Sequence, residues 1–203
     1  MYVPEYFNIK DMDTIMDFVS ENGFALLLTA SGDDVLNTLI PIIAKRNDSH
    51  VTLTGHMARA NPHWKTAEGK RSSILFLGPH HYISPRWYTI EKSVPTWNYS
   101  AVRMSGIFQT VSRAESKEIV MALSKIYDPE WASLGKEKEQ YYEKMVDEIV
   151  GFRLDVQDIM CKMKLSQNRP VADRLKVIEN LKKEKSSDAQ MVAAMMEHYS
   201  INK

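Results

Sequence analysis

Residues 54–64, with the sequence TGHMARANPHW, concentrate side chains that could bind a phosphate, a metal or an aromatic ligand. Asn61 is a residue type that caps helix N-termini and a proline follows it, so we expect a short helix over residues 62–68 that ends before Gly69. Arg59 precedes this helix, where free backbone N–H groups and the helix dipole favour an anion. Because a guanidinium binds phosphate through two parallel bonds, Arg59 and the helix start form a candidate phosphate site. The alternative is a surface arginine beside an ordinary cap.

The two histidines of this segment form a weaker candidate for metal binding. His56 and His63 are seven residues apart across a strand-to-helix turn, and no HExxH or Cys/His pair accompanies them. The glycines form neither GxGxxG nor GxxxxGK[ST], which argues against a Rossmann turn and a P-loop. No serine has the GxSxG setting, and the single cysteine, Cys161, lacks a local cue for a lowered pKa. The sequence therefore offers no catalytic nucleophile.

A second candidate region is the aromatic segment 79–99, which contains three prolines and which we expect to be a long ordered loop. Flat rings held by a stiff backbone suit a planar ligand such as a flavin, a haem or an unstacked base. The alternative is that these rings plug one end of a barrel or form a dimer interface. The rings belong to Trp87, Tyr88, Trp97 and Tyr99, and the interleaved cations Arg86, Lys92 and Arg103 keep nucleic acid open as a ligand.

The charge and composition of the chain restrict its partners. Its 26 Lys and Arg balance 26 Asp and Glu, so no overall field recruits nucleic acid or an acidic membrane. The basic excess near the C-terminus lies in residues 162–169 rather than in the last helices, so direct DNA binding has weak support from charge. One cysteine, no apparent signal peptide and no apolar run of membrane-spanning length predict a cytoplasmic protein without a membrane partner.

Periodicity along the chain predicts six strands interleaved with helices. This order indicates an α+β, mainly β fold, an antiparallel barrel with peripheral helices. The expected strands are 24–30, 35–45, 51–55, 72–78, 101–112 and 152–165, with Pro41 at an edge or bulge and a β-bulge near Gln157-Asp158 where the alternation slips by one residue. The expected helices are 9–22, 62–68, 114–127, 136–150 and two more in the last 34 residues, hinged at Ser186-Ser187.

Several blocks of the sequence together resemble the PaiB-type proteins, bacterial transcriptional regulators with an FMN-binding domain. The blocks are MYVPEYF, GHMARANPHW, YISPRWY, VPTWNYSAV and KLSQNRPVADRLKVIENL, and they extend from residue 1 to about residue 181. The resemblance implies an FMN-binding split β-barrel over residues 1–169, a helical extension over 170–203 and a homodimer. It also implies negative regulation of sporulation and of degradative protease genes.

The resemblance also suggests which residues contact the cofactor. The phosphate-binding segment of related oxidases resembles Thr54-Gly55 followed by Arg59, whereas the family's serine and lysine are absent here and Thr38 stands where an arginine is expected. The resemblance implies FMN as the cofactor, and because losing cationic contacts weakens phosphate binding, weak or absent FMN binding is an outcome that the sequence leaves open. Residues 166–168 could bond the flavin ring across the dimer, or simply cap the strand end. The predicted cofactor-binding residues are Thr38, Thr54, Gly55, His56, Arg59, Asn61, Trp97, Asn98, Tyr99, Ser166, Gln167 and Asn168.

Two other functions remain open from the sequence. One is a flavin-dependent reductase or oxidase, in which the flavin carries the chemistry and the protein supplies binding and orientation. The other is a haem-binding split-barrel protein, with His56, His63, His80 or His81 as the axial ligand. A regulator is the first hypothesis because of the resemblance to the PaiB-type proteins.

Overall fold

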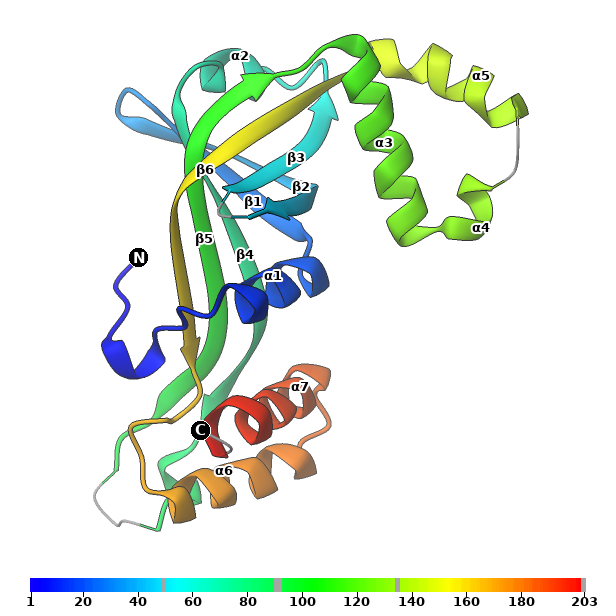
Figure 1. The fold of residues 1–203 in the computed structure, drawn as a ribbon. Coiled ribbons are helices and arrows are strands. Elements are labelled where there is room, and N and C mark those ends of the chain that lie inside the picture. Colours follow the sequence, from blue (N-terminus) through cyan, green and yellow to red (C-terminus); the bar gives the residue numbers. More distant parts are fainter. Residues whose placement is uncertain (49, 90–92, 134–135, 202–203) are drawn as a thin grey trace. The chain divides into compact units, whose positions relative to one another are not determined.

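The computed structural model describes residues 1–48, 50–89, 93–133 and 136–201 (Figure 1). The chain groups into two compact units. Unit 1 comprises Met1–Ile15, Leu77–Val102 and Met160–Lys203, and unit 2 comprises Met16–Phe76 and Arg103–Ile159. The division at residues 169 and 170 that the sequence suggested stays a prediction about domains. Among the described residues, no helix is both long enough and apolar enough to cross a bilayer.

Six strands form a sheet in the order β1-β2-β3-β6-β5-β4, which closes into a barrel because β1 also pairs with β4. The pairs β1–β2, β2–β3, β3–β6 and β1–β4 are antiparallel. The first two expected strands are confirmed, and they form an antiparallel hairpin. The strands are β1 Phe24–Ser31, β2 Asp34–Asn47, β3 His50–Ala58, β4 Arg71–Ile83, β5 Thr96–Thr110 and β6 Ile149–Lys164.

The side chains of β3 alternate between the inner and the outer face of the barrel. Leu53, Gly55 and Met57 are buried, whereas Thr54 and His56 between them are partly exposed. Successive side chains of a strand point to opposite faces, so Thr54 and His56 lie on the outer face of the barrel. The sequence predicted that Thr54, Gly55 and His56 contact a cofactor, but only Thr54 and His56 are available to a ligand outside the barrel.

β5 and β6 approach each other closely at Gly106. A Cβ atom at this position would lie 1.9 Å from the carbonyl oxygen of Asp155 and 2.9 Å from a methyl group of Leu154. Real side chains essentially never approach a backbone oxygen this closely, so only glycine fits here. The contact lies in unit 2, beside the stacked rings of Phe108 and Phe152, whose centres are 4.7 Å apart.

The helices begin where the sequence offers capping side chains. Ser112 and Glu115 form a capping box at the start of α3, and Asp128 accepts a bond from the Trp131 N–H at the start of α4. The helical elements are η1 Glu5–Phe7, α1 Met12–Glu21, α2 His63–Ala67, η2 Pro85–Trp87, α3 Arg113–Tyr127, α4 Pro129–Ala132, α5 Lys136–Met145, η3 Val146–Glu148, α6 Val171–Lys183, α7 Ser187–Met196 and the π-helix η4 Glu197–Ile201.

Two boundaries predicted from the sequence are wrong. The long loop predicted over 79–99 is shorter at both ends, because β4 continues to Ile83 and β5 begins at Thr96, with η2 at Pro85–Trp87 between them. The helix over 136–150 ends at Met145, since the chain tightens into η3 and enters β6. An edge position for Pro41 is also wrong, because β2 pairs with both β1 and β3, whereas the alternative of a bulge at Pro41 stays a prediction.

The alternation of β6 changes phase as predicted. Phe152 and Leu154 are buried in its first half, and Cys161 and Met163 are buried in its second half. Even-numbered residues therefore face the interior in unit 2 and odd-numbered residues in unit 1. The β-bulge near Gln157-Asp158 that would produce this slip stays a prediction.

Candidate functional site

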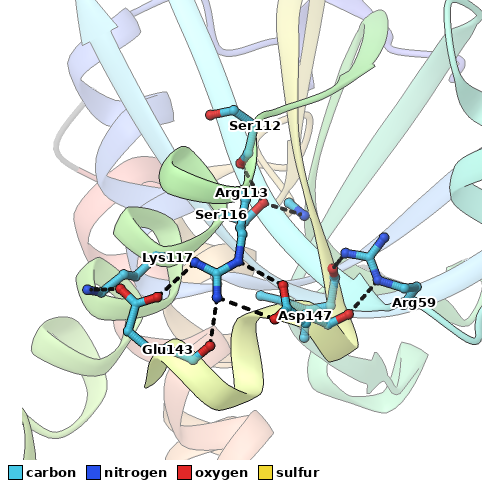
Figure 2. Close-up of polar contacts among 9 residues, drawn as sticks. Arg59, Ser112, Arg113, Ser116, Lys117, Glu143 and Asp147 are labelled. Atoms are coloured by element: carbon cyan, nitrogen blue, oxygen red, sulfur yellow. Dashed lines mark hydrogen bonds and ion pairs between the residues drawn. The ribbon is translucent and has the colours of Figure 1, made fainter. Parts of the chain in front are cut away.

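Arg59 lies just beyond β3, and its guanidinium is held by the backbone at the start of β6. Nε donates to the carbonyl oxygen of Asp147 at 2.5 Å, and Nη2 donates to that of Ile149 at 2.7 Å (Figure 2). These acceptors are neutral. Within the part of the chain that the structure describes, Arg59 forms no ion pair, so its positive charge is not neutralised by a bonded carboxylate.

A second arginine, Arg113, approaches Asp147 from the first turn of α3. Its Nε donates to Asp147 Oδ1 and its Nη1 to Glu143 Oε2, both at 2.7 Å, and Lys117 also binds Glu143 (Figure 2). Hydrogen bonds from Lys117 and Arg113 lower the pKa of Glu143 to about 2. The network therefore stays ionised at neutral pH and ties α3 to α5 and η3.

A cavity of about 250 Å³ lies between the two arginines, and we call it the Arg59 pocket. Its wall includes Arg59, Arg113, Trp64 and Thr110, and the Trp64 indole N–H donates to the Arg59 carbonyl oxygen at 3.1 Å. Unlike Arg113, which is already bound to two carboxylates, Arg59 has unused N–H donors. The donor set therefore fits a phosphate group at Arg59.

His56 lines another cavity, of about 210 Å³, on the outer face of β3. The other walls of this cavity include the apolar side chains of Val120, Met145 and Ile149. The His56 Nδ1 atom is buried and has no hydrogen-bond partner among the described residues. Burial lowers the pKa of His56, so the imidazole is neutral at pH 7. Thr54 lines a separate cavity of about 180 Å³, whereas Gly55 faces the barrel interior.

A chain of hydrogen bonds brings Thr38 and Asn61 together around His63. The Asn61 amide donates to Thr38 Oγ1 at 3.1 Å, and Thr38 Oγ1 lies 2.8 Å from His63 Nδ1. His63 Nε2 lies 2.9 Å from Thr29 Oγ1, which in turn bonds Ser72 at 2.7 Å. Asn61 Oδ1 also accepts the His63 N–H, although the N-cap residue of α2 is Pro62 rather than the predicted Asn61. This group anchors α2 to β1 and β2.

The predicted cofactor-binding residues of unit 1 come together only in part. Asn98 and Ser166 are buried and bond each other at 3.0 Å, and Asn98 also contacts the Met196 sulfur. The Gln167 side chain bonds the backbone of Met163 and Leu165, which matches the strand-end capping alternative. Asn168, by contrast, is exposed.

Two predicted aromatic residues lie on the opposite side of β5 from Asn98. Trp97 is 53% exposed and lines an open cavity of about 320 Å³ with Tyr99 and His80. Of the interleaved cations, Arg103 pairs with Asp158 at 2.7 Å and Arg86 bonds Ser84, whereas Lys92 lies outside the described residues. The Trp97 side chain is therefore accessible to solvent in unit 1.

Comparison with known protein families shows to which family the chain belongs. The profile of the family described as "Putative FMN-binding domain" matches residues 1–158. The chain belongs to this FMN-binding family. A curated relative, the protease synthase and sporulation protein PAI 2 of Bacillus subtilis, is 36% identical over 97% of each chain, which confirms the resemblance to PaiB-type proteins. An uncharacterized protein of Emericella nidulans is 27% identical and covers 89% of this chain and 91% of its own.

Two solved structures have the same fold as this chain. The flavocytochrome Anf3 of Azotobacter vinelandii has a TM-score of 0.61 at 16% identity, covering 80% of this chain and 72% of its own. The FAD and heme binding protein of Mycobacterium smegmatis has a TM-score of 0.59 at 13% identity, covering 77% and 73%. The predicted split-barrel fold is thereby confirmed.

The role of His63 at the centre of the Thr38 and Asn61 group was not predicted from the sequence. His63 was considered only as a metal or haem ligand, yet it is 2% exposed and both ring nitrogens contact threonine hydroxyls. No sequence signal links His63 to Thr29, because strand pairing creates that proximity. Within the described ranges, no group of three or more His, Cys, Asp or Glu side chains could hold a metal ion. Burial raises the pKa of Cys161 to about 12, so its thiolate is not populated at neutral pH.

Proposed function

We propose that this protein is an FMN-binding transcriptional regulator of the PaiB type, which acts in the cytoplasm as a repressor of sporulation and degradative protease genes. Family membership and the name of the Bacillus subtilis relative support the regulatory part. The observation that carries the ligand assignment is the Arg59 guanidinium, which is bound only to neutral carbonyl oxygens beside a cavity.

The Arg59 pocket suits one end of the cofactor rather than all of it. FMN supplies a planar redox-active ring and a phosphate group when bound. Whole-ligand pockets usually measure about 300–1,000 Å³, so a cavity of about 250 Å³ would hold the phosphate end only. Arg59 would donate its unused N–H groups there, while its bonds to Asp147 and Ile149 fix the orientation of the guanidinium. Ring contacts by residues 97–99 and 166–168 stay predictions.

Arg59→Ala is expected to weaken FMN binding about tenfold or more, because a charge-assisted hydrogen bond contributes about 1.5–3 kcal/mol. The measurement is a titration of flavin fluorescence with purified protein. Arg59→Lys keeps the charge without the planar fork and is expected to bind with intermediate affinity. Arg71→Ala is the matched control, because Arg71 is an exposed arginine in the same unit that bonds Gln157. Equal FMN affinity in Arg59→Ala and wild type would refute the assignment.

We also propose that the protein is a homodimer. Phe24 and Leu39, on the neighbouring strands β1 and β2, are 64% and 61% exposed, so two large apolar side chains face solvent on this part of the barrel wall. A dimer interface would cover them. Light scattering should give twice the chain mass for the wild type and a monomer mass for Leu39→Glu, whereas a monomeric wild type at micromolar concentration contradicts the proposal.

A further inference from the structure

The side of β5 and β6 that carries Trp97 and Tyr99 in unit 1 also carries two lysines. The Lys162 Nζ atom lies 5.1 Å from the centre of the Tyr99 ring, and Lys164 donates to the Trp97 carbonyl oxygen at 2.9 Å. Since residues two apart on a strand share a face, Trp97 lies beside Tyr99 and Lys162 beside Lys164. These four residues form what we call the ring–lysine face.

No carboxylate neutralises the two lysines among the residues that the structure describes. Lys162 is only 8% exposed and donates to the Tyr2 carbonyl oxygen at 3.1 Å, and Lys164 also donates to the Thr96 hydroxyl. All of these acceptors are neutral. Burial and the nearby Lys162 charge lower the pKa of Lys164, so the two ammonium groups repel each other. An anion beside them would relieve this repulsion.

Unit 1 as a whole carries a net positive charge. Its segments 1–15, 77–102 and 160–203 contain twelve Lys and Arg against nine Asp and Glu, a net charge of +3 in a chain whose total is zero. Unit 2 is therefore net −3. Such an asymmetry within one chain favours contact of the positive unit with a polyanion.

The aromatic part of the face has free flat surface. Trp97 is 53% exposed, and Tyr82 on β4, whose ring centre lies 6.2 Å from that of Trp97, is 42% exposed. The cavity of about 320 Å³ lined by Trp97, Tyr99 and Leu77 opens beside them. The exposed part of the Trp97 side chain is therefore open to a planar ring from solvent.

We propose that the ring–lysine face binds single-stranded nucleic acid. A base stacks on Trp97, a backbone phosphate contacts Lys164, and Lys162 adds attraction from its more buried position. Exposed aromatic residues on a sheet with cations beside them are how many proteins hold unpaired nucleotides, whereas a duplex does not present its base faces. This inference goes beyond the proposed regulator and does not depend on FMN binding.

The test is the fluorescence anisotropy of a fluorescein-labelled thymidine oligonucleotide of about ten nucleotides, titrated with the full chain. Trp97→Leu is expected to weaken binding about fivefold or more, because stacking on one aromatic ring is lost. Lys164→Gln is expected to reduce the slope of log affinity against log salt by about 0.7, the value for one phosphate contact. Lys185→Gln is the matched control, because it removes an exposed lysine of unit 1 outside the face. Its affinity should fall less than that of Lys164→Gln.

Three outcomes would overturn the assignment. A duplex of the same length that binds equally well would show attraction by charge alone, and unchanged affinity in Trp97→Leu would remove the stacking site. Loss of FMN binding in Trp97→Leu with unchanged oligonucleotide binding would assign the face to the flavin ring instead. Arg59→Ala separates the two proposals, because it should weaken FMN binding and leave the oligonucleotide affinity unchanged. Melting temperatures of all variants confirm that each is folded.

Discussion

Gly106→Ala is expected to destabilise the barrel strongly, although it adds only one methyl group. The new Cβ would meet the Asp155 carbonyl oxygen at 1.9 Å and the carbonyl carbon at 2.8 Å. A backbone group cannot rotate away as a side chain can, so β5 and β6 would have to separate. We expect a loss of about 3 kcal/mol or more in the free energy of unfolding, measured by urea denaturation.

The matched control is Gly32→Ala, at the turn between β1 and β2. Gly32 has a φ of +62°, and no atom lies within 4 Å of the place that an added methyl group would occupy, so alanine there meets backbone strain without a clash. The expected cost is about 1 kcal/mol. If Gly106→Ala costs no more than Gly32→Ala, the close approach of β5 and β6 is wrong.

His63→Leu is expected to produce the second large effect. Leucine approximates the volume of the ring but removes the contacts of both nitrogens with Thr38 and Thr29 inside the barrel wall. The two hydroxyls keep their other partners, Asn61 and Ser72, which limits the loss. We expect a decrease of about 2 kcal/mol in the free energy of unfolding at pH 7.5. His50→Leu, at an exposed position on β3, should change it by less than about 0.5 kcal/mol.

The same variant should flatten the pH dependence of stability. Burial lowers the pKa of His63 below its ordinary value of about 6.5, so below that pH the unfolded chain binds a proton that the folded chain does not. The contribution of His63 to the free energy of unfolding is therefore fully present above pH 6.5, and it is lost as the pH falls toward the lowered pKa of His63 in the folded protein. His63→Leu removes this contribution and leaves that of His56, whose pKa burial also lowers. An equally steep pH dependence in His63→Leu would show that His63 is not the responsible group.

Local sequence signals predicted what depends on neighbouring residues. Asn61 before a proline indicated the start of α2, and the structure shows its side chain accepting the His63 N–H. Gly69 has the left-handed φ of +69° expected of a residue that follows a helix. The alternation of Phe152 and Leu154, then Cys161 and Met163, located the phase change of β6. These features need no knowledge of the fold.

Contacts between distant segments could not be predicted in this way. The Arg59 guanidinium binds carbonyl oxygens of Asp147 and Ile149, about ninety residues away, because β3 pairs with β6. The bond between Asn98 and Ser166 likewise depends on β5 lying beside β6. The sequence predicted Arg59, Asn98 and Ser166 as cofactor-binding residues, whereas only the sheet order explains which of their atoms face a cavity and which bond other residues.

The segment from α3 to η3 leaves the barrel and returns to the same place. The Val111 N–H donates to the Gly151 carbonyl oxygen at 3.0 Å, and the Gly151 N–H donates to the Ser116 hydroxyl at 3.1 Å. Because both ends of this excursion meet at Gly151, its helices are attached to the barrel where β5 ends and β6 begins. The same segment also provides walls for the cavities at Thr54, His56 and Arg59. A substitution in this one segment would therefore change a cavity wall without changing a strand of the barrel.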